Sequence, residues 1–341
     1  MIGFVVRLSL LTLALIQFTG CKGSSSDSAP TTPVTYSVKS NQSLNISGRE
    51  VDLYVPSNAT SAIVFLHGGG GNKEGFAYNL GLKTTSNSFS YTLTSAGQAW
   101  LAKEKVIAVF PQGLTVGGAN WTWSNRVMTS GADDVLFLQN LVAAIKADTS
   151  LPAVSKVYIV GHSNGGMMAN RMWCESPNTF DGYVTFAGPP STKLASTGAN
   201  PCNPTATKPY MGVVGDRDRV LQSGGNMNAT NWTIASSLVS NANAWEDATP
   251  QVLNDKVYHT TRVGIKCSGS VGTPTTSGQV TTYSDCNDSV KLVVIAQVTV
   301  NSTMSGGDHC IATLSGPCVT TLTGNTGIDL KQLAVDFLKN F

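Results

Sequence analysis

The chain has 341 residues, of which 41% are hydrophobic and only 12% are charged, with 22 Lys and Arg against 20 Asp and Glu. Because positive and negative charges nearly balance, the overall electrostatic field of the protein does not attract nucleic acid or an acidic polymer. The hydrophobic fraction is ample for a buried core, and the length fits one large domain behind an N-terminal leader.

The first twenty residues are typical of a signal peptide. Arg7 precedes an apolar run over residues 8–18 that is too short to span a bilayer. The run ends in Phe18-Thr19-Gly20-Cys21, which resembles a bacterial lipoprotein cleavage site with Cys21 as the lipidated residue. A conventional signal peptide that releases a soluble protein is the alternative. Lys22 points to the outer membrane, so we expect an extracytoplasmic protein, either an outer-membrane lipoprotein or secreted.

We expect the chain to have three parts. Residues 1–20 form the signal peptide, and residues 21–35 hold the lipidated cysteine and a Ser- and Pro-rich tether. Residues 36–341 remain for a single folded domain. On this organisation the protein contacts a membrane only through its N-terminal lipid anchor.

The first strongly apolar strand, Ala62–Leu66, leads directly into His67 and a run of four glycines. A backbone without side chains can bring its N–H groups close to a ligand oxygen. Such groups stabilise the negative charge that develops on a carbonyl oxygen during acyl transfer. We expect Gly69 to supply one of these donors, and a plain flexible loop is the alternative.

The next segments predict a strand, an aromatic loop and a helix. The strand is Val106–Phe110, and the loop carries Trp121 and Trp123, whose rings could stack on a sugar or phenolic group of a substrate. The alternative is that at least one of these tryptophans belongs to the core. Asp133 and Asp134 precede a helix with one apolar face, so we interpret them as capping residues rather than metal ligands.

A strand, a tight turn and a helix follow at Val157–Gly166, where the chain reads Gly161-His162-Ser163-Asn164-Gly165. This pattern holds a serine hydroxyl out at the carboxyl edge of a sheet. Ser163 is therefore the candidate nucleophile, and the Asn164 amide is the expected second donor to the oxyanion.

Later apolar runs complete an alternating pattern of strands and helices. The predicted strands and the closing helix are Val184–Ala187, Met211–Val214, Val257–Ile265, Val280–Tyr283, Leu292–Ala296 and residues 328–338. Alternation of this kind predicts an α/β protein with a mostly parallel, doubly wound sheet flanked by helices.

A serine nucleophile needs a histidine base, and the chain has four histidines. His67 belongs to the glycine loop, and His259 lies in a strand pattern. His162 lies in the turn next to Ser163, and its side chain is expected to point away from the serine. His309 remains, in a loop after a late strand, where the base of such an enzyme should lie.

The acid that orients this base should lie between the serine and the histidine in chain order. Two aspartates follow the strand Met211–Val214. Asp218 is our choice because it can reach back toward the histidine, and Asp216, which is more typical of a turn residue, is the alternative.

Seven cysteines also point to an oxidising compartment. They are Cys21, Cys174, Cys202, Cys267, Cys286, Cys310 and Cys318. Without the lipidated Cys21, six remain for three disulfides, for which 15 pairings exist. Sequential pairing is the simplest, and it joins Cys174 to Cys202, Cys267 to Cys286 and Cys310 to Cys318. No cysteine or histidine spacing predicts a metal site.

Together these motifs resemble the secreted polyhydroxybutyrate depolymerase and feruloyl esterase family of α/β-hydrolases, over roughly residues 45–341. The motifs are His67–Asn72, Phe110–Gly113, Trp121–Trp123, Asp133–Val135 and Gly161–Gly166. The resemblance implies an α/β-hydrolase fold, no cofactor, hydrolysis of carboxylic esters, and a triad of Ser163, Asp218 and His309. Two departures stand near the substrate groove: Cys310 follows the histidine where the family often has Trp-Pro, and Val214-Gly215-Asp216 stands where it often has His-Gly-Thr.

We therefore expect a serine esterase. The resemblance implies feruloyl or acetyl esters on plant polysaccharide, or polyhydroxyalkanoate, as its substrates. The near balance of charge predicts no nucleic acid among its partners. A catalytically inactive surface binding protein on the same fold is one alternative, since fold alone does not establish activity. A serine peptidase is the other.

Overall fold

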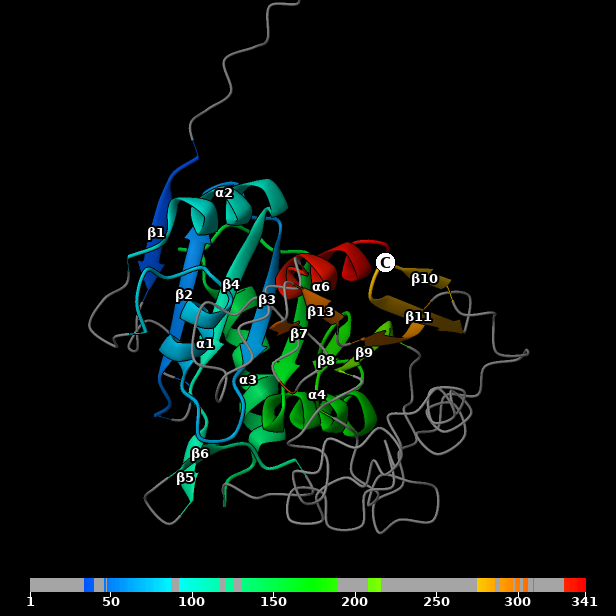
Figure 1. Cartoon of the computed structure of the whole chain (residues 1–341). Helices are drawn as coiled ribbons and strands as arrows, with labels where there is room; N and C mark the ends of the chain where they lie inside the picture. The colour runs from blue at the N-terminus through cyan, green and yellow to red at the C-terminus, as the bar shows by residue number, and fades with distance from the viewer. Residues whose placement is uncertain are drawn as a thin grey trace, which may run out of the picture. The chain divides into compact units, whose positions relative to one another are not determined.

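The computed structural model of the chain has a β-sheet at its centre (Figure 1). The residues that it describes are 34–39, 46, 48–86, 92–116, 120–125, 131–188, 208–215, 275–285, 289–296, 298–300, 303–305, 309 and 328–341. The described residues from 34 onward belong to one compact unit.

The strands in chain order are β1 Tyr36–Lys39, β2 Val51–Pro56, β3 Ser61–Leu66, β4 Val106–Pro111, β5 Leu114–Val116, β6 Asn120–Thr122, β7 Lys156–His162, β8 Tyr183–Phe186, β9 Tyr210–Gly215, β10 Thr275–Ser277, β11 Val280–Asp285, β12 Val290–Ile295, β13 Val298–Val300 and β14 Thr303–Ser305. The helices are α1 Lys73–Asn79, α2 Ser95–Glu104, α3 Asp134–Ala147, α4 Asn164–Glu175 and α6 Leu330–Leu338.

Ten of the described strands form one sheet in the order β1-β2-β4-β3-β7-β8-β9-β12-β11-β10. The central strands from β4 to β12 run parallel, and the pairs at both edges are antiparallel. The expectation of a mostly parallel sheet is confirmed. Of the predicted strands, Val257–Ile265 lies outside the described residues, and the hairpins β5–β6 and β13–β14 were not predicted.

Alternating side chains explain why helices cover both faces of the sheet. In β3, Val64 and Leu66 belong to one core, whereas Ile63 and Phe65 belong to the other. Successive residues of a strand point to opposite faces, so a continuous apolar run needs cover on both sides. Helices α3 and α4 pack in the first core, and α1, α2 and α6 pack in the second.

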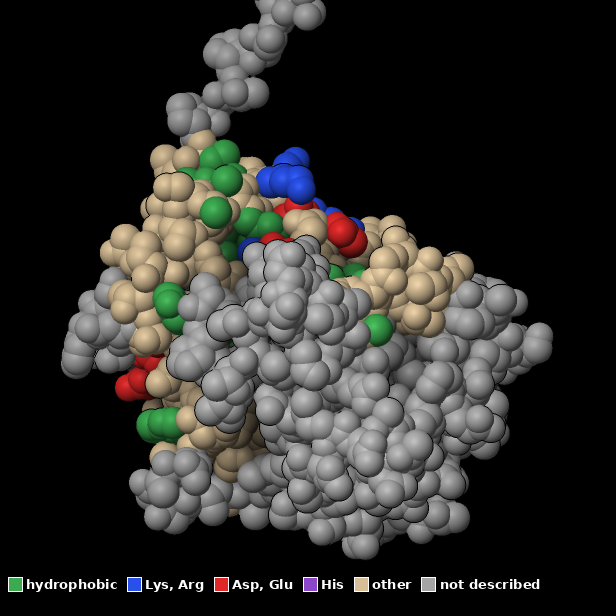
Figure 2. All heavy atoms as spheres, in the orientation of Figure 1, with side chains coloured by type: hydrophobic (Ala, Val, Ile, Leu, Met, Phe, Trp, Pro, Cys, Tyr) green, Lys and Arg blue, Asp and Glu red, His purple; other side chains and the backbone are tan. Residues whose placement is uncertain are grey.

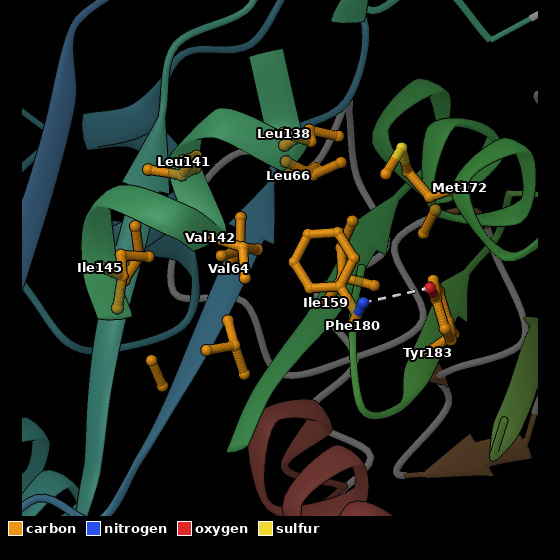
Figure 3. Close-up of a cluster of buried hydrophobic side chains, with 14 of the residues drawn as sticks. Val64, Leu66, Leu138, Leu141, Val142, Ile145, Ile159, Met172, Phe180 and Tyr183 are labelled. Atoms are coloured by element: carbon orange, nitrogen blue, oxygen red, sulfur yellow. Dashed lines mark hydrogen bonds between the residues drawn. The ribbon is translucent and has the colours of Figure 1, made fainter. Parts of the chain in front are cut away.

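The first core lies between the sheet and helices α3 and α4. Figure 3 shows how side chains of α3 and α4 meet those of β3 and β7. The labelled residues are Val64, Leu66, Leu138, Leu141, Val142, Ile145, Ile159, Met172, Phe180 and Tyr183. The strand order, together with a sharp turn between β7 and α4, identifies an α/β-hydrolase fold, as expected.

Figure 2 shows where charged side chains lie on one face of the described residues. On this face they gather in small groups among uncharged side chains. None of the described helices is long and apolar enough to cross a membrane.

Candidate active site

Ser163 occupies the sharp turn between β7, which ends at His162, and α4, which begins at Asn164. Its backbone has φ 53° and ψ −121°, a left-handed conformation that costs a non-glycine residue energy. A Cβ on Gly161 would lie 2.2 Å from the carbonyl oxygen of Gly165. A Cβ on Gly165 would lie 2.4 Å from that of Leu66. Only glycine fits at either position, so the turn holds the serine at its tip.

His309 lies directly against this serine. Its Nε2 is 2.8 Å from the Ser163 Oγ, although the two residues are far apart in the sequence. The imidazole is buried, with 8% of the residue exposed. This is the contact through which a histidine accepts the proton of a serine nucleophile. Asp218 and the alternative Asp216 lie outside the described residues.

The glycine loop passes over the same turn. A Cβ on Gly68 would lie 3.3 Å from the Ser163 Cβ, and one on Gly69 would lie 3.5 Å from the Asn164 Cβ. The Gly70 N–H donates to the Trp121 carbonyl at 2.8 Å, so this amide is engaged within the protein. The structure thus brings both predicted donor positions, 69 and 164, to the side of the serine.

His67 fixes the shape of this loop. The Gly113 N–H donates to its Nε2 at 3.0 Å, so the proton of the neutral ring must be on Nδ1. Nδ1 then donates to the Gly68 carbonyl at 2.8 Å. Burial lowers the pKa of His67 to about 4, against the opposing effects of this hydrogen bond and of the Glu74 charge.

A buried ionic group stands behind His67. The Lys73 ammonium pairs with Asp52 at 3.1 Å and also with Glu74. Burial alone would lower the pKa of Lys73, but its hydrogen bonds and charge contacts with these two carboxylates raise it. The backbone N–H of Lys73 donates to Gln112 Oε1 at 3.0 Å. This bond turns the amide nitrogen of Gln112 toward His67 Nε2, which is 3.0 Å away.

Trp123 is a core residue, so the prediction that it binds substrate is wrong. Its ring is fully buried, and its Nε1 donates to the His67 carbonyl at 3.0 Å. Its backbone N–H donates to Asn164 Oδ1 at 2.7 Å, which ties the loop to the first residue of α4. The alternative that at least one tryptophan belongs to the core is therefore confirmed. Trp121, on β6, is 38% exposed.

Asp134 has a role that the sequence did not reveal. Asp133 caps α3 as expected, because its Oδ1 accepts from the Leu136 N–H at 3.0 Å. Asp134 is instead fully buried, pairs with Arg49 at 2.5 Å, and accepts from the Ser124 N–H at 2.5 Å. The hydrogen bond from Ser124 holds the segment that carries Trp123, and nothing in the local sequence pattern indicates the distant arginine that pairs with Asp134.

Cys174, at the end of α4, is disulfide-bonded to a partner outside the described residues. The other cysteines of the predicted pairs, with Cys21, lie outside them too, so the pairing stays a prediction. Within the described part of the chain, no group of three or more His, Cys, Asp or Glu residues is arranged to hold a metal ion.

No protein-family model matches the chain, and no curated protein matches it in sequence. Among solved structures, an acetyl xylan esterase from Aspergillus awamori is similar over 77% of this chain and 93% of its own, with 14% identity and a TM-score of 0.47. A predicted CIB-like hydrolase from Thermoplasma acidophilum is similar over 91% and 100%, with 12% identity and a TM-score of 0.44. The Pyrococcus furiosus esterase Pf2001 is similar over 90% and 93%, with 13% identity and a TM-score of 0.42. These likenesses concern the fold alone.

Proposed function

We propose that the protein is a serine esterase that hydrolyses carboxylic esters. The observation that carries the proposal is the 2.8 Å contact between His309 Nε2 and the Oγ of Ser163, a serine in a strained turn at the carboxyl end of a central strand. A structural serine has no need of a left-handed backbone, and such strain is concentrated at functional sites.

The reaction proceeds in two steps. Ser163 Oγ attacks the ester carbonyl while His309 takes its proton, and the amides of Gly69 and Asn164 stabilise the oxyanion. The imidazolium returns the proton to the departing alcohol, which leaves an acyl-enzyme. His309 then takes a proton from water as the water oxygen attacks the acyl carbon. The imidazolium returns this proton to Ser163 Oγ as the bond from Oγ to the acyl carbon breaks and the carboxylic acid leaves. Asp218 orients the base in this scheme, with Asp216 as the alternative, and no metal or cofactor takes part.

For the substrate we propose feruloyl or acetyl esters on plant polysaccharide, or polyhydroxyalkanoate chains. The family resemblance of the motifs supports this class, and so does the exposed ring of Trp121, which could stack on a sugar or phenolic group. Release assays on methyl ferulate, acetylated xylan and amorphous polyhydroxybutyrate would separate the candidates. Cleavage of peptide substrates with none of these esters would instead favour the peptidase.

Hydrolysis of p-nitrophenyl acetate tests the catalytic residues. Ser163→Ala and His309→Ala should each reduce turnover at least about a thousandfold, as expected when one member of a catalytic unit is removed. More than a tenth of the activity in either variant would reject the assignment. Asp218→Asn should cost far more than Asp216→Asn, and the reverse ranking would move the role of the acid to Asp216.

A fluorophosphonate probe distinguishes an enzyme from an inactive binding protein on the same fold. The wild-type protein should be labelled, and Ser163→Ala should not be. Absence of label on the folded wild-type protein would favour the binding protein.

We also propose that Cys21 carries a lipid and anchors the protein outside the cytoplasm. The lipoprotein-like sequence that ends at this cysteine supports the proposal. Wild-type protein produced in bacteria fed labelled palmitate should take up the label, and Cys21→Ala should not. Release of unlabelled wild-type protein into the medium would indicate a conventional signal peptide instead.

A further inference from the structure

His162 lies between the segments that form the site. It is the last residue of β7, directly before Ser163, and its Nε2 is 3.0 Å from the backbone carbonyl oxygen of His309. The ring centroids of His162 and His309 are 5.1 Å apart. On the glycine-loop side, a Cβ on Gly68 would lie 3.2 Å from His162 Nδ1, and the ring of Phe76 is 6.2 Å away. The sequence left this histidine without a role.

The contact with His309 determines the protonation of His162. A carbonyl oxygen only accepts hydrogen bonds, so the proton of the neutral ring is on Nε2. Burial lowers the pKa of His162 to about 3, and the nearby His309 acts in the same direction, against the hydrogen bond to the His309 backbone. The ring is therefore a neutral, fixed donor at physiological pH.

We propose that His162 is a positioning residue that holds the main chain of His309, so that the imidazole of His309 stays in reach of Ser163. The proposal rests on the proposed esterase function. Two consecutive residues of the turn then contact His309. Ser163 contacts its side chain, and His162 contacts its backbone carbonyl.

The second contact matters most in the acyl-enzyme. Once Ser163 Oγ is acylated, it has no proton to donate, and His309 loses that hydrogen bond. The base must nevertheless stay in place to activate water. The bond from His162 Nε2 to the His309 carbonyl involves neither the nucleophile nor the substrate, so it persists through both steps. Loss of this bond should slow deacylation more than acylation.

Two variants separate a donor at Nε2 from general packing. In His162→Gln the amide nitrogen can occupy nearly the place of Nε2, whereas in His162→Asn it falls near Nδ1. Misplacement of a catalytic group by about 1 Å can cost on the order of a hundredfold. We expect His162→Asn to lower kcat for p-nitrophenyl acetate at least about tenfold. His162→Gln should keep most of the wild-type rate.

The split between kinetic constants identifies the affected step. When deacylation slows, the acyl-enzyme accumulates, so KM should fall together with kcat in His162→Asn, kcat/KM should change less, and a burst of p-nitrophenol should appear. Wild-type rates in both variants, or equal losses in both folded variants, would overturn the proposal. A wild-type protein that neither hydrolyses esters nor binds a fluorophosphonate would overturn the esterase function as well.

A measurement on the wild-type protein tests the protonation of His162 directly. The chain has four histidines, so long-range ¹⁵N–¹H spectra of the imidazoles can be assigned by single substitutions. His162 should appear as the neutral Nε2–H form from pH 5 to 8, and His67 as the neutral Nδ1–H form. An Nδ1–H form of His162, or its titration near the ordinary pKa of about 6.5, would overturn the proposal.

Discussion

Acidification should destabilise the folded protein through His67. Burial lowers the pKa of this residue from 6.5 to about 4. Above the higher value both the folded and the unfolded states hold a neutral ring, so His67 adds no pH dependence. Between the two values the unfolded state binds a proton that the folded state does not, and the free energy of unfolding falls as the pH falls. Below about pH 4 the loss is complete.

The size of the effect follows from the pKa difference. One unit corresponds to about 1.4 kcal/mol, so a pKa lowered from 6.5 to about 4 costs about 3 kcal/mol at full protonation. About 2 kcal/mol of this is already lost at pH 5. The cause of the lowered pKa is the burial of the ring, which disfavours its charged form. A protonated Nε2 also can no longer accept from Gly113 and Gln112.

Urea unfolding at pH 8 and pH 5 measures this loss. His67→Asn provides the comparison, because asparagine does not titrate and its amide can still donate to the Gly68 carbonyl. The free energy of unfolding of this variant should fall by about 2 kcal/mol less than that of the wild type between the two pH values. Gln112→Leu is the control, since it disturbs the same site but keeps the imidazole and most of the pH dependence. Equal pH dependence in His67→Asn and wild type would refute the reasoning.

Three further predictions concern residues around the site. Gly165→Ala should prevent folding, since its Cβ would lie 2.4 Å from a backbone oxygen, whereas Gly69→Ala meets only a 3.5 Å contact and should remain folded by circular dichroism. Trp121→Ala should raise KM for methyl ferulate several-fold with little change in thermal stability, whereas Trp123→Ala should lose about 3–5 kcal/mol in urea unfolding. Similar stabilities of the two tryptophan variants would contradict their different burial. Arg49→Met should cost about 3–5 kcal/mol in the same assay, because it removes the positive charge that pairs with the buried carboxylate of Asp134, and a change below 1 kcal/mol would argue against the ion pair.

The central strands and the turn at Ser163 could be predicted because each follows from a local pattern. An apolar run such as Val157–Val160 must be buried on both faces, and glycines at positions 161 and 165 are needed wherever a strand turns sharply into a helix. His309 was predicted by elimination among four histidines, and the structure places it against the serine.

The supporting contacts could not be predicted, because each depends on a partner that is distant in the sequence. A lysine in the first turn of a helix is ordinarily exposed, but the contact with Asp52 on β2 allows the burial of Lys73. Asp134 reads as a cap until Arg49 is placed beside it. Trp123 differs from Trp121 only by two positions, and what buries it is the packing of α3 and the glycine loop around its ring.

The arrangement of three histidines explains how one of them can act as the base. His67 and His162 are both held neutral, with their protons on opposite nitrogens, because one accepts from a backbone N–H at Nε2 and the other donates to a backbone carbonyl from Nε2. A proton added to His67 would break the contact that shapes the glycine loop. Burial disfavours a proton on His162, and so would the positive charge of the neighbouring imidazolium that forms at His309. In the proposed mechanism, His309 is therefore the one described histidine that can accept the proton of Ser163 without disturbing the site.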